Sequence, residues 1–194
     1  MIPAPQLPEP RRFTPSAIRR TVRLSLLLLV VVLTVLSGSV LAQSPPAAGG
    51  AVYVVPINGT IDLGLAPYLS RILAEAEASG AAAVVLEIDT PGGRLDAVLQ
   101  MRDALLSSPV PTIAFVDRTA FSAGALIAIA CEEIYMAPGA VMGAATPVDG
   151  AGETATEKIV SAVRTTFKAT AEARGRDPLV AEAMVDPDAV AYTH

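Results

Sequence analysis

Two stretches of the sequence could together stabilise the negative charge that develops on oxygen during acyl transfer. Residues 89–93 (DTPGG) follow an apolar run, and Gly92 and Gly93 can turn the backbone sharply and leave their N–H groups bare. Ser122 opens the small-residue, apolar run 122–131, where a helix would set free N–H groups and its positive dipole end beside the hydroxyl. Such N–H groups stabilise an alkoxide or a tetrahedral oxyanion. The alternatives are an ordinary strand-to-helix turn at 89–93 and a helix N-cap at Ser122.

A serine nucleophile also needs a base, and the sequence offers few. The only histidine is His194, the last residue, so a histidine triad is excluded unless the chain end folds back. Lys158, one of two lysines, follows the polar, glycine-containing stretch 149–156 and is the predicted general base. The alternative for this residue is a solvated surface lysine. The acids that could orient a base, each of which also fits an exposed or capping role, are Glu87, Asp89 and Asp117.

The second lysine, Lys168, would share a helix with Lys158. Ten residues of helix separate two side chains by about 15 Å along the axis and roughly 80° around it, so both cannot reach Ser122. Lys158 belongs to the first turn, beside the loop that could close over the site. A lysine base must be unprotonated, and burial disfavours the charged form of a lysine. We therefore expect Lys158, buried when the site closes, to be the base.

The single cysteine, Cys131, ends the apolar run 122–131 and has no internal histidine to activate it. One cysteine cannot form an internal disulfide or a cysteine cluster for zinc. A thiol in apolar surroundings behaves as a small hydrophobic group and is inert. The sequence therefore predicts that Cys131 packs in the core.

Strand-like and helix-like blocks alternate from residue 51 onward. Strands are predicted where short apolar runs end at turn residues, at 51–57, 83–88, 112–116, 134–136 and 141–145. Helices are predicted where apolar residues recur at helical spacing, at 65–80, 95–106, 122–131 and 157–174. The helix at 122–131 is apolar nearly all round and should be buried. This alternation predicts an α/β layered domain.

The N-terminal part of the sequence predicts an association with a membrane. Residues 1–23 are basic, and residues 24–42 are uncharged and, at about 28 Å as a helix, long enough to cross the hydrocarbon core. The segment 24–42 is either the apolar region of a cleaved secretory signal or a retained transmembrane anchor. Residues 43–50 (QSPPAAGG) form a linker. The positive-inside rule keeps the arginines in the cytoplasm and places residues 51–194 on the extracytoplasmic side.

The charges of the chain are unevenly distributed. Five arginines against Glu9 give residues 1–42 a charge of +4, and the remaining 9 basic and 18 acidic side chains give the rest about -9. An acidic surface repels phosphate backbones, so we expect no nucleic-acid partner. A buried core helix is the alternative for residues 24–42, but no apolar stretch of matching size lies nearby to cover it.

Four features follow one another along the chain: IDTPGG at 88–93, AFSAGALIAIA at 120–130, IYMAPGAVMGAATPV at 134–148 and the helix that begins near Lys158. Together they resemble the membrane-bound serine proteases of the NfeD family, within the ClpP/crotonase superfamily. The resemblance implies a ClpP-like ββα spiral, a serine–lysine dyad without metal or organic cofactor, and a homo-oligomer, a dimer or larger. It also implies cleavage of apolar segments, in some members within the C-terminal region of a stomatin-type membrane protein.

The motifs also imply a role for individual residues. Ser122 would be the nucleophile, Lys158 the general base, and the N–H groups of Gly92 or Gly93, together with Ala123, would form the oxyanion hole. The implied function is a membrane-associated serine endopeptidase acting on a peptide or membrane-protein substrate. Long family members continue into further membrane helices and a small OB-like domain, so we expect the protease domain, 51–194, to be truncated at its C-terminus.

Two other functions fit parts of the sequence. A signal-peptide-peptidase-A-like hydrolase shares the serine–lysine chemistry but is longer, and its lysine lies in another part of the fold. A catalytically inactive ClpP-fold module could instead bind stomatin-like partners. A crotonase-type acyl-CoA enzyme fits poorly, because an exported compartment lacks CoA and the sequence supplies no convincing pair of carboxylates.

Overall fold

The computed structural model describes residues 50–189, so the basic segment 1–23, the apolar segment 24–42 and nearly all of the linker lie outside the described residues. The helices and strands follow the predicted alternation. In chain order they are β1 (Val52–Asn58), α2 (Leu65–Ser79), β2 (Ala83–Thr90), α3 (Leu95–Leu106), β3 (Thr112–Phe121), α4 (Ala123–Ala130), β4 (Glu133–Met136), β5 (Val141–Gly143), α5 (Glu157–Ala173) and α6 (Pro178–Ala183). Across residues 50–189, each helix is too short or too polar to span a bilayer.

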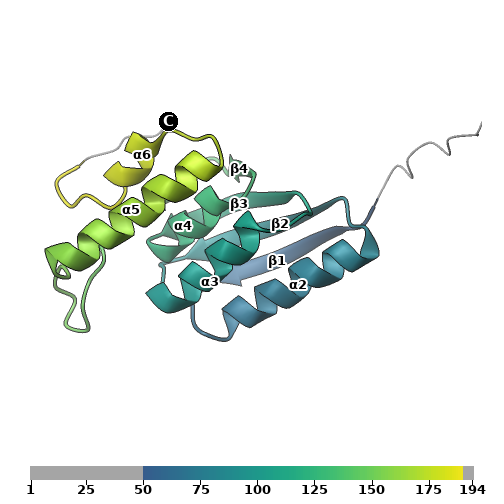
Figure 1. Ribbon diagram of the computed structural model, residues 1–194, viewed down its shortest axis with the longest axis horizontal. Helices are drawn as coiled ribbons and strands as arrows, with labels where there is room; N and C mark the ends of the chain where they lie inside the picture. Colours follow the sequence, from purple (N-terminus) through teal and green to yellow (C-terminus); the bar gives the residue numbers. More distant parts are fainter. Residues whose placement is uncertain (1–49, 190–194) are drawn as a thin grey trace, which may run out of the picture. The chain divides into compact units, whose positions relative to one another are not determined.

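The strands form one parallel sheet in the order β1-β2-β3-β4, and β5 pairs with the far end of β3. Val55 lies opposite Leu86, and Leu86 lies opposite Ala114, so apolar side chains align across the sheet. Parallel strands must be joined by crossovers, and helices make these crossovers here. The prediction of an α/β domain with a layered architecture is therefore confirmed (Figure 1).

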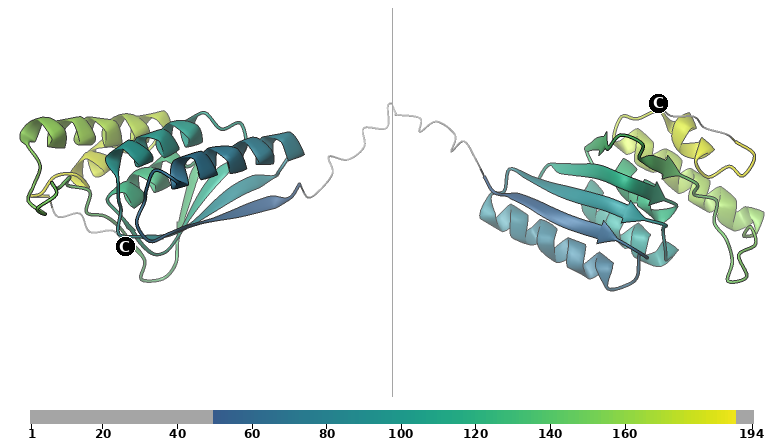
Figure 2. Two further views of the ribbon diagram at one scale, coloured as in Figure 1. Left: turned by 90° about the horizontal axis from the view of Figure 1, so that it is seen from below. Right: turned by 180° about the vertical axis from the view of Figure 1, so that it is seen from behind.

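The helices lie on one face of the sheet (Figures 1 and 2). Side chains of β2 alternate between buried and half-buried because only one face is covered within the described residues. On the uncovered face, Val52 and Val54 of β1 and Tyr135 of β4 are more than half exposed. Every residue of α4 is buried, as its uniformly apolar sequence predicts. The covered face therefore holds the core, with α4 at its centre.

The largest differences from the sequence prediction concern β3 and α6, while β2 ends two residues later than predicted and β5 two residues earlier. Strand β3 was predicted to end at residue 116 but continues to Phe121, and its register with β2 shifts between Ile88 and Thr90. The extension was missed because Asp117, Arg118 and Thr119 are polar; in the structure these three residues are half-buried or exposed. Helix α6 was not predicted, although the Asp177 side chain caps it by accepting the N–H of Leu179 at 2.8 Å, and Pro178 occupies its first turn.

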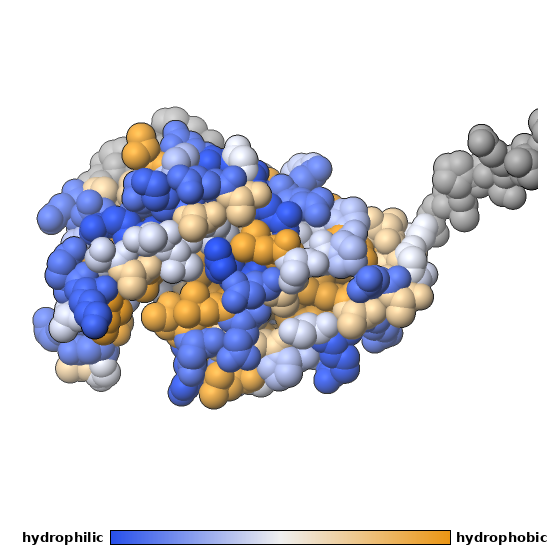
Figure 3. All heavy atoms as spheres, viewed as in Figure 1, coloured by the Kyte–Doolittle hydropathy of each residue, from blue (hydrophilic) through white to orange (hydrophobic). Residues whose placement is uncertain are grey.

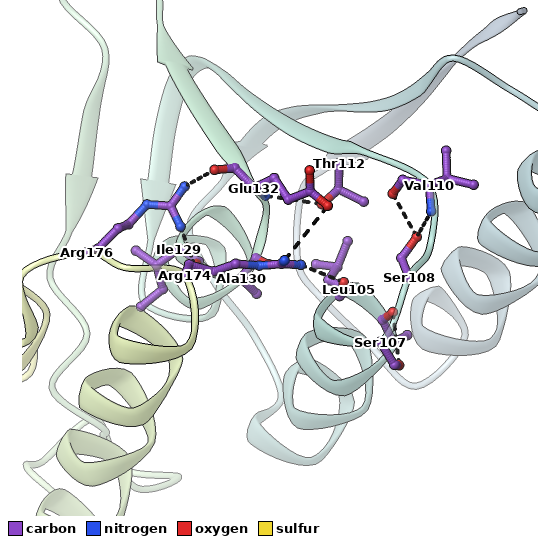
Figure 4. Close-up of polar contacts among 11 residues, drawn as sticks. Leu105, Ser107, Ser108, Val110, Thr112, Ile129, Ala130, Glu132, Arg174 and Arg176 are labelled. Carbon is purple, nitrogen blue, oxygen red and sulfur yellow. Dashed lines mark hydrogen bonds and ion pairs between the residues drawn. The ribbon is translucent and has the colours of Figure 1, made fainter.

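Two arginines that follow α5 donate hydrogen bonds to carbonyls at the C-terminal ends of α3 and α4 (Figure 4). Arg174 donates from Nε to the carbonyl of Ala130 at 2.7 Å and from Nη2 to the carbonyl of Leu105 at 2.8 Å. These carbonyls lie in the last turns of α4 and α3, where a helix leaves its carbonyls without partners. The Leu105 carbonyl also accepts the N–H of Ser108 at 3.2 Å. Arg176 donates to the carbonyl of Ile129 at 3.1 Å and to that of Glu132 at 2.8 Å. The guanidinium groups thus cap the C-terminal ends of α3 and of the buried helix α4.

We expect Arg174→Ala to lower the free energy of unfolding by about 3 kcal/mol, because hydrogen bonds to charged groups contribute about 1.5–3 kcal/mol each and two of them are lost. The matched control is Arg118→Ala, since this side chain is 77% exposed and its ion pairs measure 3.8 and 3.9 Å. The control should cost less than about 0.5 kcal/mol. Urea unfolding of both variants measures the difference. Equal costs for the two variants would contradict the capping role.

Candidate functional site

Ser122 occupies a strained position between the end of β3 and the start of α4. Its backbone has φ 50° and ψ -114°, a region that residues other than glycine rarely enter. The strain is held in place by the Ser122 N–H, which donates to the carbonyl of Gly143 at 2.8 Å. The hydroxyl makes no capping hydrogen bond to the first turn of α4. The alternative of an ordinary N-cap is therefore wrong for this side chain, which is left available for chemistry.

The two glycines of the DTPGG turn are needed for close approach. A Cβ on Gly92, where φ is 108°, would lie 2.7 Å from the Cβ of Ser122. A Cβ on Gly93 would lie 2.6 Å from the backbone nitrogen of Ile61, with which Gly93 forms a parallel bridge. Real Cβ atoms do not tolerate such distances. Only glycines let this turn pack directly against Ser122 on one side and Ile61 on the other.

The backbone N–H groups around Ser122 are not equivalent. The N–H of Gly92 donates to Oγ1 of Thr90 at 3.0 Å, so it is already engaged. Among residues 50–189, no acceptor is found for the N–H groups of Gly93 and Ala123, and both residues line the same cavity as Ser122. Ala123 is the first residue of α4, so its N–H is one of the groups that a helix leaves unsatisfied. Gly93 and Ala123 are thus the pair available to an oxyanion.

The cavity beside Ser122 has a volume of about 430 Å³ and is mostly apolar. Its walls come from α3, α4 and α5, through the side chains of Leu95, Val98, Leu126, Ile159, Val163 and Phe167. Figure 3 shows hydrophobic side chains gathered on the two sides of a hollow between the N-terminal parts of α3 and α5. Polar groups are few: Arg94, Thr146 and Asp149 also line the cavity. The space therefore suits an apolar side chain placed next to a carbonyl that Ser122 could reach.

The structure places Lys158 in the first turn of α5, where it is exposed and does not line the cavity. Its neighbour Ile159 does line the cavity, so Lys158 stands at the rim. Lys168 is bound elsewhere, because its Nζ lies 3.5 Å from the Glu182 carboxylate on α6. In this conformation neither lysine is buried against Ser122. The serine and the predicted base are therefore not brought into contact.

The carboxylates considered as orienting groups also lie away from the cavity. Asp89 accepts a hydrogen bond from Thr119 at 2.9 Å and lies 3.9 Å from Arg118. Glu87 and Asp117 sit on strands without reaching the cavity lining. Within residues 50–189 no cluster of three His, Cys, Asp or Glu side chains could hold a metal ion.

Cys131 is fully buried at the end of α4, and its thiol donates to the carbonyl of Ile127 at 3.5 Å. Burial raises the pKa of this thiol to about 12. The reactive thiolate is therefore strongly disfavoured. The prediction that Cys131 packs in the core is confirmed.

Sequence reasoning overlooked Thr90, although it lies inside the DTPGG stretch. This threonine is completely buried and contacts the turn through its hydroxyl. A threonine that ends an apolar strand and precedes Pro-Gly-Gly is a local signal of a side chain that bonds the turn. The signal was present but could not reveal which backbone group Thr90 would bind.

Comparison with known proteins identifies the family of the chain. A family model described as NfeD1b, N-terminal domain, matches residues 51–193. The chain is 43% identical over 137 residues to the membrane protein NfeD1b of Bacillus subtilis (strain 168), covering 71% of this chain and 31% of that protein. It is 33% identical over 171 residues to the membrane-bound protease PH1510 of Pyrococcus horikoshii, covering 84% of this chain and 37% of that protein. The chain thus spans about a third of the length of these curated relatives.

Solved structures share the architecture. A serine-to-alanine mutant of the 1510-N membrane-bound stomatin-specific protease aligns with a TM-score of 0.68 at 33% identity, covering 73% of this chain and 72% of that one. A lysine-to-alanine mutant of the same protease, in complex with a substrate peptide, gives 0.67 at 33% identity, with 73% and 68% covered. ClpP1 from Listeria monocytogenes gives 0.56 at 22% identity, with 70% and 79% covered, and shows the fold alone. With its fold similar to ClpP and the family model matched over residues 51–193, the chain belongs to the NfeD1b N-terminal domain family.

Proposed function

We propose that residues 51–194 form a serine endopeptidase domain that works by acyl transfer. Ser122 Oγ attacks the peptide carbonyl, and Lys158 takes its proton and returns it to the leaving amine. The N–H groups of Gly93 and Ala123 stabilise the tetrahedral oxyanion. One observation carries the proposal. Ser122 has a backbone φ of 50°, and its hydroxyl makes no capping hydrogen bond. It lines the same cavity as Gly93 and Ala123, whose N–H groups have no acceptor among the described residues. The solved relatives mutated at a serine and at a lysine support it.

We propose that the substrate presents apolar residues around the scissile bond. The cavity beside Ser122 is walled by leucine, isoleucine, valine and phenylalanine side chains from three helices. Burying an apolar side chain there is favourable by about 25 cal/mol per Å². The relative named a stomatin-specific protease was solved with a substrate peptide, which supports a stomatin-like membrane protein as the substrate of this chain.

The test is reaction of the purified protein with a fluorophosphonate probe, mapping of the modified residue, and cleavage of a peptide library. We expect modification of Ser122 alone and preferential cleavage beside apolar residues. Modification of another serine would overturn the nucleophile assignment. Equal cleavage of polar and apolar peptides would overturn the proposed specificity while leaving the assignment of Ser122 intact.

We propose that the domain lies on the extracytoplasmic side of a membrane, following the signal or anchor at residues 24–42 and the linker 43–50. Both relatives described above are named as membrane proteins, which supports the association. A reporter enzyme that is active only after export, fused after Gly50, should therefore be active. The control is a reporter that is active only in the cytoplasm, fused at the same position. Activity of that second fusion instead would reverse the proposed topology.

A second function is favoured by the position of Lys158, which is exposed at the rim of the cavity. The domain could be a catalytically inactive module that binds a stomatin-like partner through the same apolar cavity. Peptide binding without labelling of Ser122 would select this function.

The exposed valines on the open face of the sheet support the proposed homo-oligomer, because apolar patches on a surface commonly mark interfaces. Light scattering during size-exclusion chromatography measures the oligomeric state.

A further inference from the structure

Thr90 is one of three completely buried polar side chains in the described part of the chain, and it lies in the glycine turn beside Ser122. Its hydroxyl donates to the carbonyl of Gly59, at the end of β1, at 2.5 Å. The same oxygen accepts the N–H of Gly92 at 3.0 Å. A hydroxyl has one proton, so the longer 3.4 Å contact with the carbonyl of Gly92 is secondary. Thr90 therefore joins two loops that meet at the end of the sheet.

The methyl group of Thr90 faces the nucleophile helix. A Cβ placed on Gly124, the second residue of α4, would lie 2.5 Å from Cγ2 of Thr90. The backbone of α4 thus packs directly on this methyl group, and the first residue of α4 supplies one of the two unsatisfied N–H groups. One side chain therefore touches both parts of the site: the glycine turn through its hydroxyl and the start of α4 through its methyl.

The hydroxyl also decides which glycine N–H can serve an oxyanion. By accepting the N–H of Gly92, Thr90 holds the first peptide of the glycine turn. The next peptide, which carries the Gly93 N–H, is held through the Gly92 carbonyl, which accepts the N–H of Ile61 at 2.9 Å. The Gly93 N–H then remains without an acceptor among residues 50–189, in the cavity that Ser122 lines. An unbound Gly92 N–H in a buried turn would cost about 1–3 kcal/mol, which is enough to reorient the turn.

We infer that Thr90 is a positioning residue of the oxyanion hole: its hydroxyl fixes the glycine turn so that the Gly93 N–H points at the reacting carbonyl. The inference rests on the proposed peptidase function. It assigns Thr90 no contact with substrate and no share in proton transfer. Its effect is on the orientation of a donor, which matters because only a donor already aimed at the developing charge lowers the barrier.

The experiment compares Thr90→Val, which keeps the methyl and removes the hydroxyl, with Thr90→Ser, which keeps the hydroxyl. The matched control is Thr112→Val, since Thr112 is also completely buried and its Oγ1 accepts the N–H of Glu132 at 3.2 Å (Figure 4). Thr112 begins β3 and Ser122 follows the end of β3, so the control lies about 30 Å from the nucleophile. The measurements are kcat, KM, the rate of fluorophosphonate labelling, the melting temperature and hydrogen exchange of the 89–93 backbone.

We expect Thr90→Val to lower kcat by about 10- to 100-fold with little change in KM, because the lost interaction acts in the transition state. Thr90→Ser should retain kcat within about threefold. Thr112→Val should keep kcat with little change in the melting temperature, because the Glu132 N–H also donates to the Thr112 carbonyl at 2.9 Å. Hydrogen exchange of the 89–93 backbone should accelerate in Thr90→Val alone.

Three outcomes would overturn the inference. Unchanged kcat in Thr90→Val would do so, as would equal losses in Thr90→Ser and Thr90→Val, or unchanged hydrogen exchange at 89–93. In the first case the wild type would still cleave through Ser122, so the proposed function would stand and only the role of Thr90 would fail. A wild type without labelling or cleavage would overturn the proposed function, and the inference with it.

Discussion

Ser122→Ala should abolish fluorophosphonate labelling and reduce peptide cleavage by about 10⁴-fold or more, because removal of a serine nucleophile leaves only what binding and the oxyanion hole contribute. The change deletes one hydroxyl that makes no capping hydrogen bond. A backbone φ of 50° is as unfavourable for alanine as for serine, because both carry a Cβ, so the substitution leaves the backbone strain unchanged. Loss of activity with an unchanged circular dichroism spectrum and melting temperature would therefore report chemistry and not unfolding.

The control for this prediction is Ser70→Ala on the exposed side of α2. Its hydroxyl bonds only the carbonyl of Ala66, one turn earlier in the same helix, at 3.1 Å. Labelling and cleavage should be unchanged in this variant. Labelling that persists in Ser122→Ala would remove the nucleophile assignment and with it the proposed dyad.

Lys158→Ala should reduce cleavage by about 10²- to 10⁴-fold, the usual contribution of a general base, whereas Lys168→Ala should leave the rate close to that of the wild type. The number of residues between the serine and the lysine does not decide which lysine is the base. In the 1510-N structures the mutated serine and lysine are 41 positions apart, and here Lys158 and Lys168 follow Ser122 by 36 and 46 positions. The choice therefore depends on geometry.

Three features of α5 favour Lys158. Ile159, Val163 and Phe167 form the stripe of α5 that lines the cavity, and Lys158 directly precedes the first of them. Lys168 is paired with Glu182 of α6, which draws its side chain away from Ser122. Lys158 also follows the segment 148–154, whose ends pair as an antiparallel bridge beside the cavity. A small movement of this segment over a bound peptide would carry the first turn of α5 with it.

The measurement is cleavage of one peptide by both lysine variants over a range of pH. The wild-type rate should rise with pH as the base loses its proton, and this rise should be absent from the residual activity of Lys158→Ala. Lys158→Arg is a second control, because arginine keeps the charge but cannot act as a base. Full activity in Lys158→Ala, or inactivation by Lys168→Ala, would show that the base assignment is wrong while leaving Ser122 as the nucleophile.

Local sequence patterns determined most of the secondary structure and the layered fold. The helices at 65–79, 95–106 and 157–173 were predicted to within a residue or so, because an apolar stripe at helical spacing needs no distant information. The burial of α4 followed from its composition alone. The extension of β3 to Phe121 could not be predicted in this way, because it depends on the pairing of residues 119–121 with β2 and β5, which are distant in sequence.

The candidate site likewise has features that local sequence predicts and features that depend on the tertiary structure. Local residue type and position at a turn or a helix start made Ser122 and the glycine turn candidates, and the resemblance to the NfeD family added Ala123. Only the tertiary structure separated Gly93 from Gly92, since the hydroxyl that engages Gly92 is oriented by the carbonyl of Gly59, thirty-one residues away from Thr90. It also placed Lys158 at the rim of the cavity. Hydrogen-bond partners and burial depend on which segments meet in space, and a linear pattern does not contain that information.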